Sequence, residues 1–327
     1  MTPQSRPERD GSTGATRQRQ PRRPTAPDGI VVIDKPQGMT SHDVVAKMRR
    51  HAGTRKVGHA GTLDPMATGV LVIGVGRATR LLHYLTSADK SYTATVRLGI
   101  GTVSEDADGD VTCVEPVPEL SREKVAAAAV MLTGVIQQIP SSVSALKIDG
   151  QRAYDLVRAG KEVELSAREV RVSRFDVLAV RPGFTDAGQA ITDVDFSVDV
   201  SSGTYVRALG RDLAAALGTC GHLIALRRTS VAQFALDRAR TLAELEKLDV
   251  NTPLETMSMS TAVQGVFPVV EVSHETAVKI SHGQRLSPVD TDGTGRYAAV
   301  SESGSLLAVV EDNGSFGRPV TVFAPAE

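Results

Sequence analysis

Short apolar runs alternate with polar segments over most of the chain, and their spacing predicts more strands than helices. Runs rich in β-branched residues are typical of strands, and they occupy residues 29–33, 70–75, 92–100, 170–180, 191–200 and 222–234. Apolar positions at helical spacing follow Ser41, which we expect to cap the first helix, and fill residues 123–132 and 204–217. Several predicted strands follow one another directly. This order favours an α+β fold with a mixed or antiparallel sheet over a βαβ repeat.

One segment, 137–169, breaks this alternation. It holds Pro140, a serine-rich stretch and a predicted short helix at 152–158 with exposed positive charge. Long segments of this kind inside a compact domain are uncommon and often functional. We therefore treat 137–169 as an insertion that serves the function of the domain.

The same pattern divides the chain into four parts. Residues 1–27 carry six arginines and almost no apolar side chains, which predicts a disordered, Arg-rich N-terminal extension. Residues 28–240 form the main domain, and residues 241–265, a short helix followed by a Met- and Ser-rich stretch, form a linker. Residues 266–327 combine a strand, a helix and short strands with glycine turns, which indicates a small β-rich domain.

The charges are unevenly distributed along the chain, although the formal net charge is only −1. Residues 241–327 contain 5 Lys/Arg and 12 Asp/Glu, a balance of −7, which leaves 32 against 26, or +6, for residues 1–240. A basic body with an acidic tail is compatible with a nucleic-acid surface on the body.

Composition excludes several classes of protein. No apolar run approaches the roughly 18 residues that a membrane helix needs, and the N-terminus lacks the apolar core of a secretory signal. Two cysteines, Cys113 and Cys220, are too few for a disulfide framework or a four-thiolate zinc site. We therefore expect a protein of the reducing cytoplasm.

The densest group of chemically useful residues lies at 56–69 and contains His59, Asp64 and three glycines. Glycines allow positive φ and close approach of the backbone to a ligand. Asp64 and the proline after it fit a simple turn as well as a catalytic loop. The segment lacks the Gly-Lys-Ser/Thr of a phosphate loop and the glycine spacing of a dinucleotide site. No second His or Cys stands at metal-ligand spacing.

Six segments in this order, covering residues 29–235, together resemble the bacterial tRNA pseudouridine synthases of the TruB family. They are Asp34-Lys35-Pro36-Gln37-Gly38; Gly58-His59-x-Gly61-x-Leu63-Asp64-Pro65 with Ala67-Thr68-Gly69; Lys90-Ser91-Tyr92 with Leu98-Gly99; Gln138-Ile139-Pro140 with Ser144-Ala145-Leu146-Lys147 and Gly150; Gly203-Thr204-Tyr205-Val206-Arg207; and Ala225-Leu226-Arg227-Arg228-Thr229. The resemblance implies a pseudouridine synthase fold: a mixed or antiparallel sheet flanked by helices and crossed by the active cleft. It makes 137–169 an RNA-gripping insertion and 266–327 a PUA-like domain.

The resemblance also implies the reaction. Enzymes of this family flip uridine 55 out of the T-loop of tRNA and isomerise it to pseudouridine. Every atom of the product comes from the substrate, so we expect no cofactor and no metal. The carboxylate chemistry then falls to Asp64, as nucleophile or base, with Arg207 as its ion-pair partner. Tyr92 stacks on the base and assists removal of the proton from C5.

Further residues match positions that contact the RNA or line the base pocket. They are Lys35, His59, Tyr205, Leu226, Lys147, Arg152 and Arg158. Lys35 fits a structural ion pair as well as an RNA contact. The basic residues at 147, 152 and 158 fit an ordinary solvated face as well as a phosphate-binding one.

Two other functions remain open. A relative with the same fold could modify another RNA, and a non-catalytic factor could bind and fold tRNA. The joint presence of Asp64, Tyr92 and Arg207 argues against the second. We expect tRNA as the partner, no membrane, no obligate protein partner and a monomer, because no long apolar surface helix suggests an obligate dimer.

Overall fold

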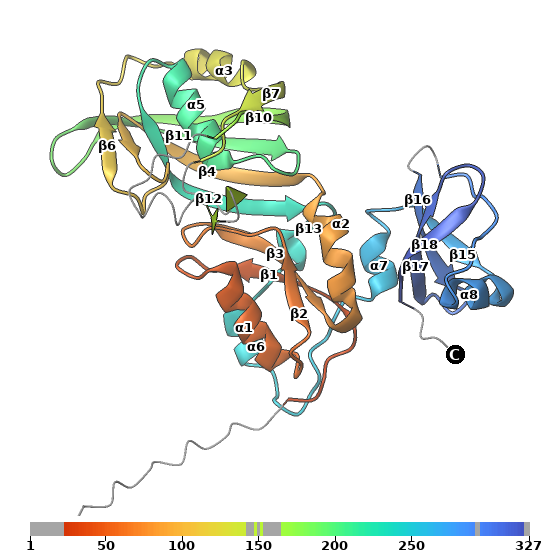
Figure 1. Cartoon of the computed structure of the whole chain (residues 1–327). Helices are drawn as coiled ribbons and strands as arrows, with labels where there is room; N and C mark the ends of the chain where they lie inside the picture. The colour runs from red at the N-terminus through yellow and green to blue at the C-terminus, as the bar shows by residue number, and fades with distance from the viewer. Residues whose placement is uncertain (1–22, 142–146, 149–150, 153–164, 292–294, 324–327) are drawn as a thin grey trace, which may run out of the picture.

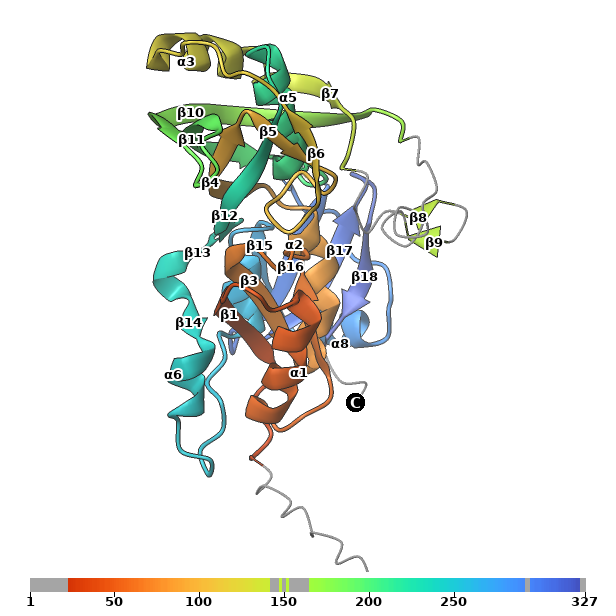
Figure 2. The ribbon, with the colours of Figure 1, turned by 90° about the vertical axis from the view of Figure 1, so that its left-hand side faces the viewer.

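The computed structural model describes residues 23–141, 147–148, 151–152, 165–291 and 295–323. Its centre is one mixed sheet, shown in Figures 1 and 2. In spatial order the strands are β14 (Arg240–Thr241), β1 (Gly29–Lys35), β3 (Thr68–Val75), β12 (Gly221–Val231), β4 (Lys90–Leu98), β11 (Ala190–Val200), β10 (Arg168–Phe184) and β7 (Gly134–Gln138). The short strands β2 (Val57–Ala60) and β13 (Phe234–Ala235) pair with β3 and β12. The predicted α+β class with a mixed sheet is confirmed.

The sheet consists of two halves that meet at a very short junction. β12 runs antiparallel to β4 along nearly its whole length. It meets β3 in parallel over two positions, where Arg227 lies opposite Thr68 and Arg228 opposite Gly69. The segment 61–67, which carries Asp64, connects β2 to β3 and ends at this junction. The predicted catalytic loop therefore sits where the two halves of the sheet join.

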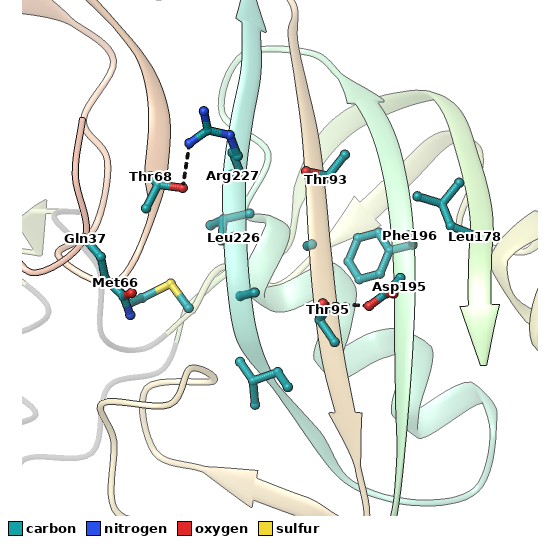
Figure 3. A pocket seen from close by; sticks show the side chains of 13 residues that line it. Gln37, Met66, Thr68, Thr93, Thr95, Leu178, Asp195, Phe196, Leu226 and Arg227 are labelled. Carbon is teal, nitrogen blue, oxygen red and sulfur yellow. Dashed lines mark hydrogen bonds between the residues drawn. The ribbon is translucent and has the colours of Figure 1, made fainter. Parts of the chain in front are cut away.

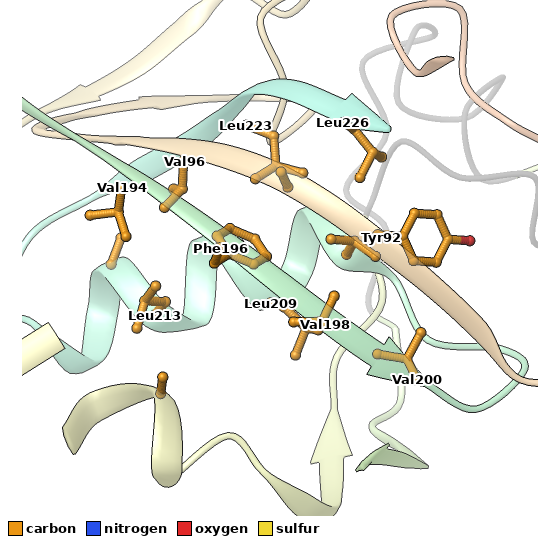
Figure 4. Close-up of a cluster of buried hydrophobic side chains, with 14 of the residues drawn as sticks. Tyr92, Val96, Val194, Phe196, Val198, Val200, Leu209, Leu213, Leu223 and Leu226 are labelled. Atoms are coloured by element: carbon orange, nitrogen blue, oxygen red, sulfur yellow. The ribbon is translucent and has the colours of Figure 1, made fainter. Parts of the chain in front are cut away.

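The half of the sheet that contains β4, β11 and β10 is covered by α5 (Val206–Ala216) and α3 (Arg122–Val130). Alternating residues of the strands bury one face against these helices. Figure 4 shows Val96 and Phe196 from the sheet packed against Leu209 and Leu213 of α5. All four side chains are fully buried. This core fixes the first turn of α5 against the sheet.

The other half of the sheet is covered on both faces. On one face α1 (Ser41–His51) and α6 (Leu242–Glu246) pack on β1 and β3 through Val44, Met48 and Leu245. On the other face lie η1 (Gly76–Leu81), α2 (Leu82–Thr86) and α7 (Met259–Val263), with η2 (Leu236–Arg238) nearby. This half holds the strands on either side of the Asp64 segment.

Three local predictions were wrong. The N-cap of α1 is Thr40, whose hydroxyl and Asp43 form a capping box, so Ser41 is already helical. The strand predicted to end at residue 180 continues as β10 to Phe184, because its pairing with β11 outweighs the turn preference of Pro182 and Gly183. Arg152, expected to begin a helix, lies in β9 (Gln151–Arg152), which pairs with β8 (Lys147–Ile148).

A two-stranded ribbon of β5 (Ile100–Thr102) and β6 (Val111–Val114) projects from the end of β4. Cys113 on this ribbon is joined by a disulfide to Cys220, the residue before β12, 107 residues later in the chain. That separation gives no sequence signal for the pairing, and the prediction of a reducing compartment did not anticipate it. The connection 103–110 between β5 and β6 reaches the N-terminal end of α5.

The C-terminal part is a small β-rich domain, as predicted. Its sheet has the order β15 (Val269–Val272), β16 (Arg296–Ser301), β17 (Leu306–Asp312) and β18 (Gly317–Val322), and α8 (His274–Ser281) packs against it. It docks on the main domain through Leu81 and Val263 and through a hydrogen bond between Tyr84 and Thr321. Among the described residues no helix is long and apolar enough to cross a membrane.

The start of the described chain also packs against the main domain. Ala26 is buried against α1, and its N–H donates to the carbonyl of Ala52. Arg23 donates to the carbonyls of Leu248 and Asp249. Residues 23–27, which the sequence assigned to the disordered extension, are therefore ordered. Residues 1–22 lie outside the described part.

Gly69 should be the most sensitive glycine at the junction of the two half-sheets. Its φ is +98°, and a Cβ there would lie 2.2 Å from the carbonyl oxygen of Arg228. We expect Gly69→Ala to lower the free energy of unfolding by about 3 kcal/mol or more. Gly188 also has positive φ but open space around it, so Gly188→Ala should cost about 1 kcal/mol. Equal losses in denaturant unfolding would contradict the steric argument.

Candidate active site

The segment 61–67 is held in one conformation by hydrogen bonds to Ser41 and within its own turn. The hydroxyl of Ser41 accepts from the N–H of Leu63 at 2.9 Å and donates to its carbonyl at 3.2 Å. The N–H of Ala67 donates to the carbonyl of Asp64 at 3.1 Å and closes the turn. The Asp-Pro turn that the sequence suggested therefore exists, and it presents the Asp64 carboxylate on a fixed backbone.

Arg207 lies in the first turn of α5 and is 5% exposed. Its Nε is 3.0 Å from Oδ2 of Asp64, and its Nη1 is 3.4 Å from Oδ2 of Asp106. Nη1 also donates to the carbonyl of Ser104 at 2.5 Å and to the hydroxyl of Ser141 at 3.2 Å. The buried guanidinium thus bridges two carboxylates, which compensates its loss of hydration.

Asp106 was missed by the sequence reasoning. It is 5% exposed, Ser104 donates to its carboxylate at 2.5 Å, and Thr102 donates to its carbonyl at 2.7 Å. Next to it, Glu105 forms an ion pair with Arg211 of α5, and burial raises the pKa of Glu105. The acidic residues after β5 were the available signal, but only the folded ribbon places them beside α5.

Tyr92 and Leu226 lie on the neighbouring strands β4 and β12, and each is 7% exposed. Figure 4 shows the phenol oxygen of Tyr92 directed away from the aliphatic side chains of the cluster. Tyr205 is the N-cap of α5, and its backbone exchanges two hydrogen bonds with the side-chain amide of Gln138. The structure thus brings Tyr92, Leu226 and Tyr205 to the same end of the core as Arg207.

His59 lies on β2, just before the Asp64 segment, and is half-buried. Its ring packs edge-on against that of His42, with ring centroids 5.4 Å apart. Burial, with a smaller contribution from His42, lowers the pKa of His59. A neutral imidazole therefore stands beside the loop at pH 7.

Lys35 is completely buried at the end of β1. Its ammonium donates to three backbone carbonyls, those of Pro36, Met39 and Pro65, at 2.9, 2.6 and 3.3 Å. Burial lowers the pKa of Lys35 to about 8, although the negative charge of Asp64 opposes the shift. Through its hydrogen bond to the carbonyl of Pro65, the buried ammonium holds the backbone of the Asp64 segment.

The predicted basic residues of the insertion are described only in part. Lys147 and Arg152 lie in the paired strands β8 and β9, which Figure 2 shows apart from the main sheet. Arg158 lies outside the described residues.

A hollow of about 460 Å³ opens on the other face of the sheet (Figure 3). Thr93 and Thr95 line it, and they point away from the core that contains Val96 and α5. Of the predicted site residues that the structure describes, Leu226 borders it. The hollow therefore borders the Asp64 segment through Met66, although Asp64 and Arg207 are not among its lining residues.

The arrangement around Asp64 suits carboxylate chemistry. One oxygen of Asp64 is held by Arg207, and the side chain remains 38% exposed, so substrate can reach it. A guanidinium binds a carboxylate through charge-assisted hydrogen bonds, which fix its orientation. Among the described residues, the side chains whose potential ligand atoms lie close enough together to hold a metal ion are those of Cys113, Glu115 and Cys220. The two cysteines of this group form a disulfide with each other.

The comparisons with known proteins agree with this geometry. The family model described as "TruB family pseudouridylate synthase (N terminal domain)" matches residues 49–206. The "tRNA pseudouridine synthase B" of Arthrobacter sp. strain FB24 is 52% identical over 305 residues, 91% of this chain and 97% of the relative. The chain belongs to the TruB family. Its members are pseudouridylate synthases, which are RNA-modifying isomerases.

Other matches extend the TruB assignment over the rest of the chain. Two further family models, "tRNA pseudouridylate synthase B C-terminal domain" and "tRNA Pseudouridine synthase II, C terminal", match residues 207–263 and 267–324. The "tRNA pseudouridine synthase B" of Mycobacteroides abscessus is 50% identical over 303 residues, covering 93% of this chain and 98% of the relative.

A solved structure shows the same fold. "Structure of H/ACA RNP bound to a substrate RNA containing 2'-deoxyuridine" aligns with a TM-score of 0.65 at 24% identity. The alignment covers 91% of this chain and 86% of that one. The predicted pseudouridine synthase fold is confirmed.

Asp106 should be needed to hold Arg207. Asp106→Asn keeps the shape but removes a buried negative charge beside the guanidinium. We expect a loss of about 1 to 3 kcal/mol in the free energy of unfolding and a slower rate of pseudouridine formation. Asp193→Asn, which breaks a half-buried ion pair with Arg97 in the same sheet, is the control. A wild-type rate in Asp106→Asn would contradict this role.

Lys35 should make stability depend on pH. Its folded-state pKa is about 8, and that of an unfolded lysine is about 10.4. Between these values the unfolded chain binds more protons, so the contribution of Lys35 to stability rises with pH. From pH 7.5 to 9.5, wild type should gain about 2 kcal/mol relative to Lys35→Met. Denaturant unfolding at both pH values tests this, and a constant or falling difference would contradict it.

Proposed function

We propose that this protein converts uridine 55 in the T-loop of tRNA to pseudouridine, with Asp64 as the catalytic carboxylate. The observation that carries the proposal is the contact of 3.0 Å between Asp64 and the buried Arg207, beside Tyr92 and Leu226. The relatives named tRNA pseudouridine synthase B support the choice of tRNA as substrate.

The reaction breaks the bond between C1′ and N1 of the uridine, rotates the uracil and joins C5 to C1′. Asp64 either adds to C1′ or removes a proton from the neighbouring sugar carbon, and an ionised carboxylate can do both. Arg207 orients that carboxylate through the ion pair. When C5 joins C1′, Asp64 is released from C1′ or the sugar carbon regains its proton; the proton on C5 then leaves with Tyr92 assisting, and N1 takes up a proton. The base needs no other reactant, so the reaction proceeds without a cofactor.

The base must leave the stack of the T-loop before it reaches Asp64. We propose that His59 enters the space that the base vacates, and that Tyr205 and Leu226 border the flipped base. Lys35 acts by holding the backbone of the loop, because its ammonium is buried and bound to backbone carbonyls. Lys147, Arg152 and Arg158 supply phosphate contacts from the insertion, which position RNA without reading its sequence.

The same proposal covers the organisation of the molecule. Residues 28–240 form the catalytic domain, the insertion lies at about 137–169, residues 241–265 link the domains, and 266–327 form a PUA-like domain. The enzyme acts as a monomer in the cytoplasm, where its tRNA substrate is found, without an obligate protein partner.

The decisive variant is Asp64→Asn, which keeps the turn but removes the charge. We expect it to fold and to bind T-arm RNA as tightly as wild type, because affinity comes mainly from basic residues. Its rate should fall by several orders of magnitude. The measurement is single-turnover pseudouridine formation at position 55, with Asp89→Asn, an exposed aspartate paired with Arg171, as control.

Three results would overturn parts of this proposal. Activity of Asp64→Asn within about tenfold of wild type would remove the aspartate mechanism and favour an RNA-folding factor. A pseudouridine formed only at another position would remove the assignment to uridine 55. Modification of a different RNA, with tRNA untouched, would favour a relative with another substrate.

A further inference from the structure

Three buried cations, Lys35, Lys90 and Arg228, lie around the segment that carries Asp64. They are 0%, 9% and 1% exposed. Their side-chain hydrogen bonds all go to backbone carbonyls. Within the described ranges, none of the three has a carboxylate at salt-bridge distance. Burying a charge without a counter-ion is costly. The stability of the fold therefore does not explain why three cations are buried around this segment, and another role has to be considered.

Arg228 has the most informative contacts of the three. It is on β12 at the junction of the half-sheets, opposite Gly69. Its Nε donates to the carbonyl of Val70 at 2.7 Å, and its Nη2 donates to the carbonyl of Gly61 at 2.9 Å. Gly61 begins the Asp64 segment, and Val70 follows its end. One guanidinium therefore connects the two ends of the loop.

We propose that Arg228 is a positioning residue, which fixes the Asp64 carboxylate by clamping both ends of the loop that carries it. This inference rests on the function proposed above. Arg207 orients the carboxylate itself, whereas Arg228 holds the backbone from which the carboxylate projects. A displacement of about 1 Å at a reacting group can cost about a hundredfold in rate, so a clamp on the loop has a direct catalytic consequence.

The geometry around Gly61 supports the clamp. Gly61 has φ +76°, and a Cβ there would lie 3.3 Å from both Nη1 of Arg228 and Cε of Lys90. The loop thus begins directly against the guanidinium. Lys90 cannot replace Arg228, because its ammonium is already bound to the carbonyls of Thr86 and Ala88 at 2.9 and 2.7 Å. A rigid planar fork can reach two separated carbonyls, which a single ammonium does less well.

The test is Arg228→Lys, which keeps the positive charge but loses the fork. We expect the single-turnover rate at saturating T-arm RNA to fall about a hundredfold, with the dissociation constant of the RNA within about threefold. Amide hydrogen exchange in peptides covering 61–70 should become faster. If Arg228→Lys does not fold, Arg228→Gln is measured in the same way, since its amide can still reach one carbonyl.

The matched control is Arg97→Lys. Arg97 lies on β4 of the same sheet and forms a two-point ion pair with Asp193, away from the loop. Its rate and its exchange in 61–70 should stay at wild-type values, and thermal unfolding of both variants shows whether they lose similar stability. If both variants lost rate in the same proportion to their loss of unfolding temperature, the positioning role would be overturned.

The remaining outcomes separate this inference from the proposed function. A wild-type protein that forms no pseudouridine would overturn the proposed function before any variant is compared. An active wild type with an equally active Arg228→Lys, or with unchanged exchange in 61–70 of the variant, would overturn the positioning role alone.

Discussion

The buried guanidinium of Arg207 is the group on which the site depends. It carries its charge into the interior of the protein, where only well-placed acceptors compensate the lost hydration. Asp64 and Asp106 supply those acceptors, so three separate segments must meet there: the segment 61–67, the connection 103–110 and the first turn of α5. Any displacement of one segment leaves a buried charge partly uncompensated.

The sheet makes that meeting possible. Its two halves are paired through β3 and β12, which run parallel for two residues, and Gly69 permits this approach because a side chain there would strike the backbone of Arg228. The loop that carries Asp64 ends at the same place. Lys35 and Arg228 then bind its carbonyls from within the protein. Backbone dipoles, rather than side-chain ion pairs, accept these buried charges and hold the loop.

The strands and the main helices were predictable from the sequence because their residues bury one face of a regular element. The errors arose where local preference and pairing compete. Ser41 is a good capping residue, but Thr40 beside it forms the capping box with Asp43. Arg152 follows a helical pattern, but it pairs with Lys147 in a short ribbon. Cys113 and Cys220 are too far apart in the chain for their pairing to be visible.

The sequence by itself determined which groups are available for the chemistry. An aspartate in a glycine-rich turn, a tyrosine on a strand and an arginine at the start of a helix stood in segments of a pseudouridine synthase, and their order identified the family. Only the tertiary structure decided how those groups are held. Asp106 and Arg228 act through contacts with residues 101 and 167 positions away. Such contacts depend on how strands from distant parts of the chain come together, which local residue pattern does not specify.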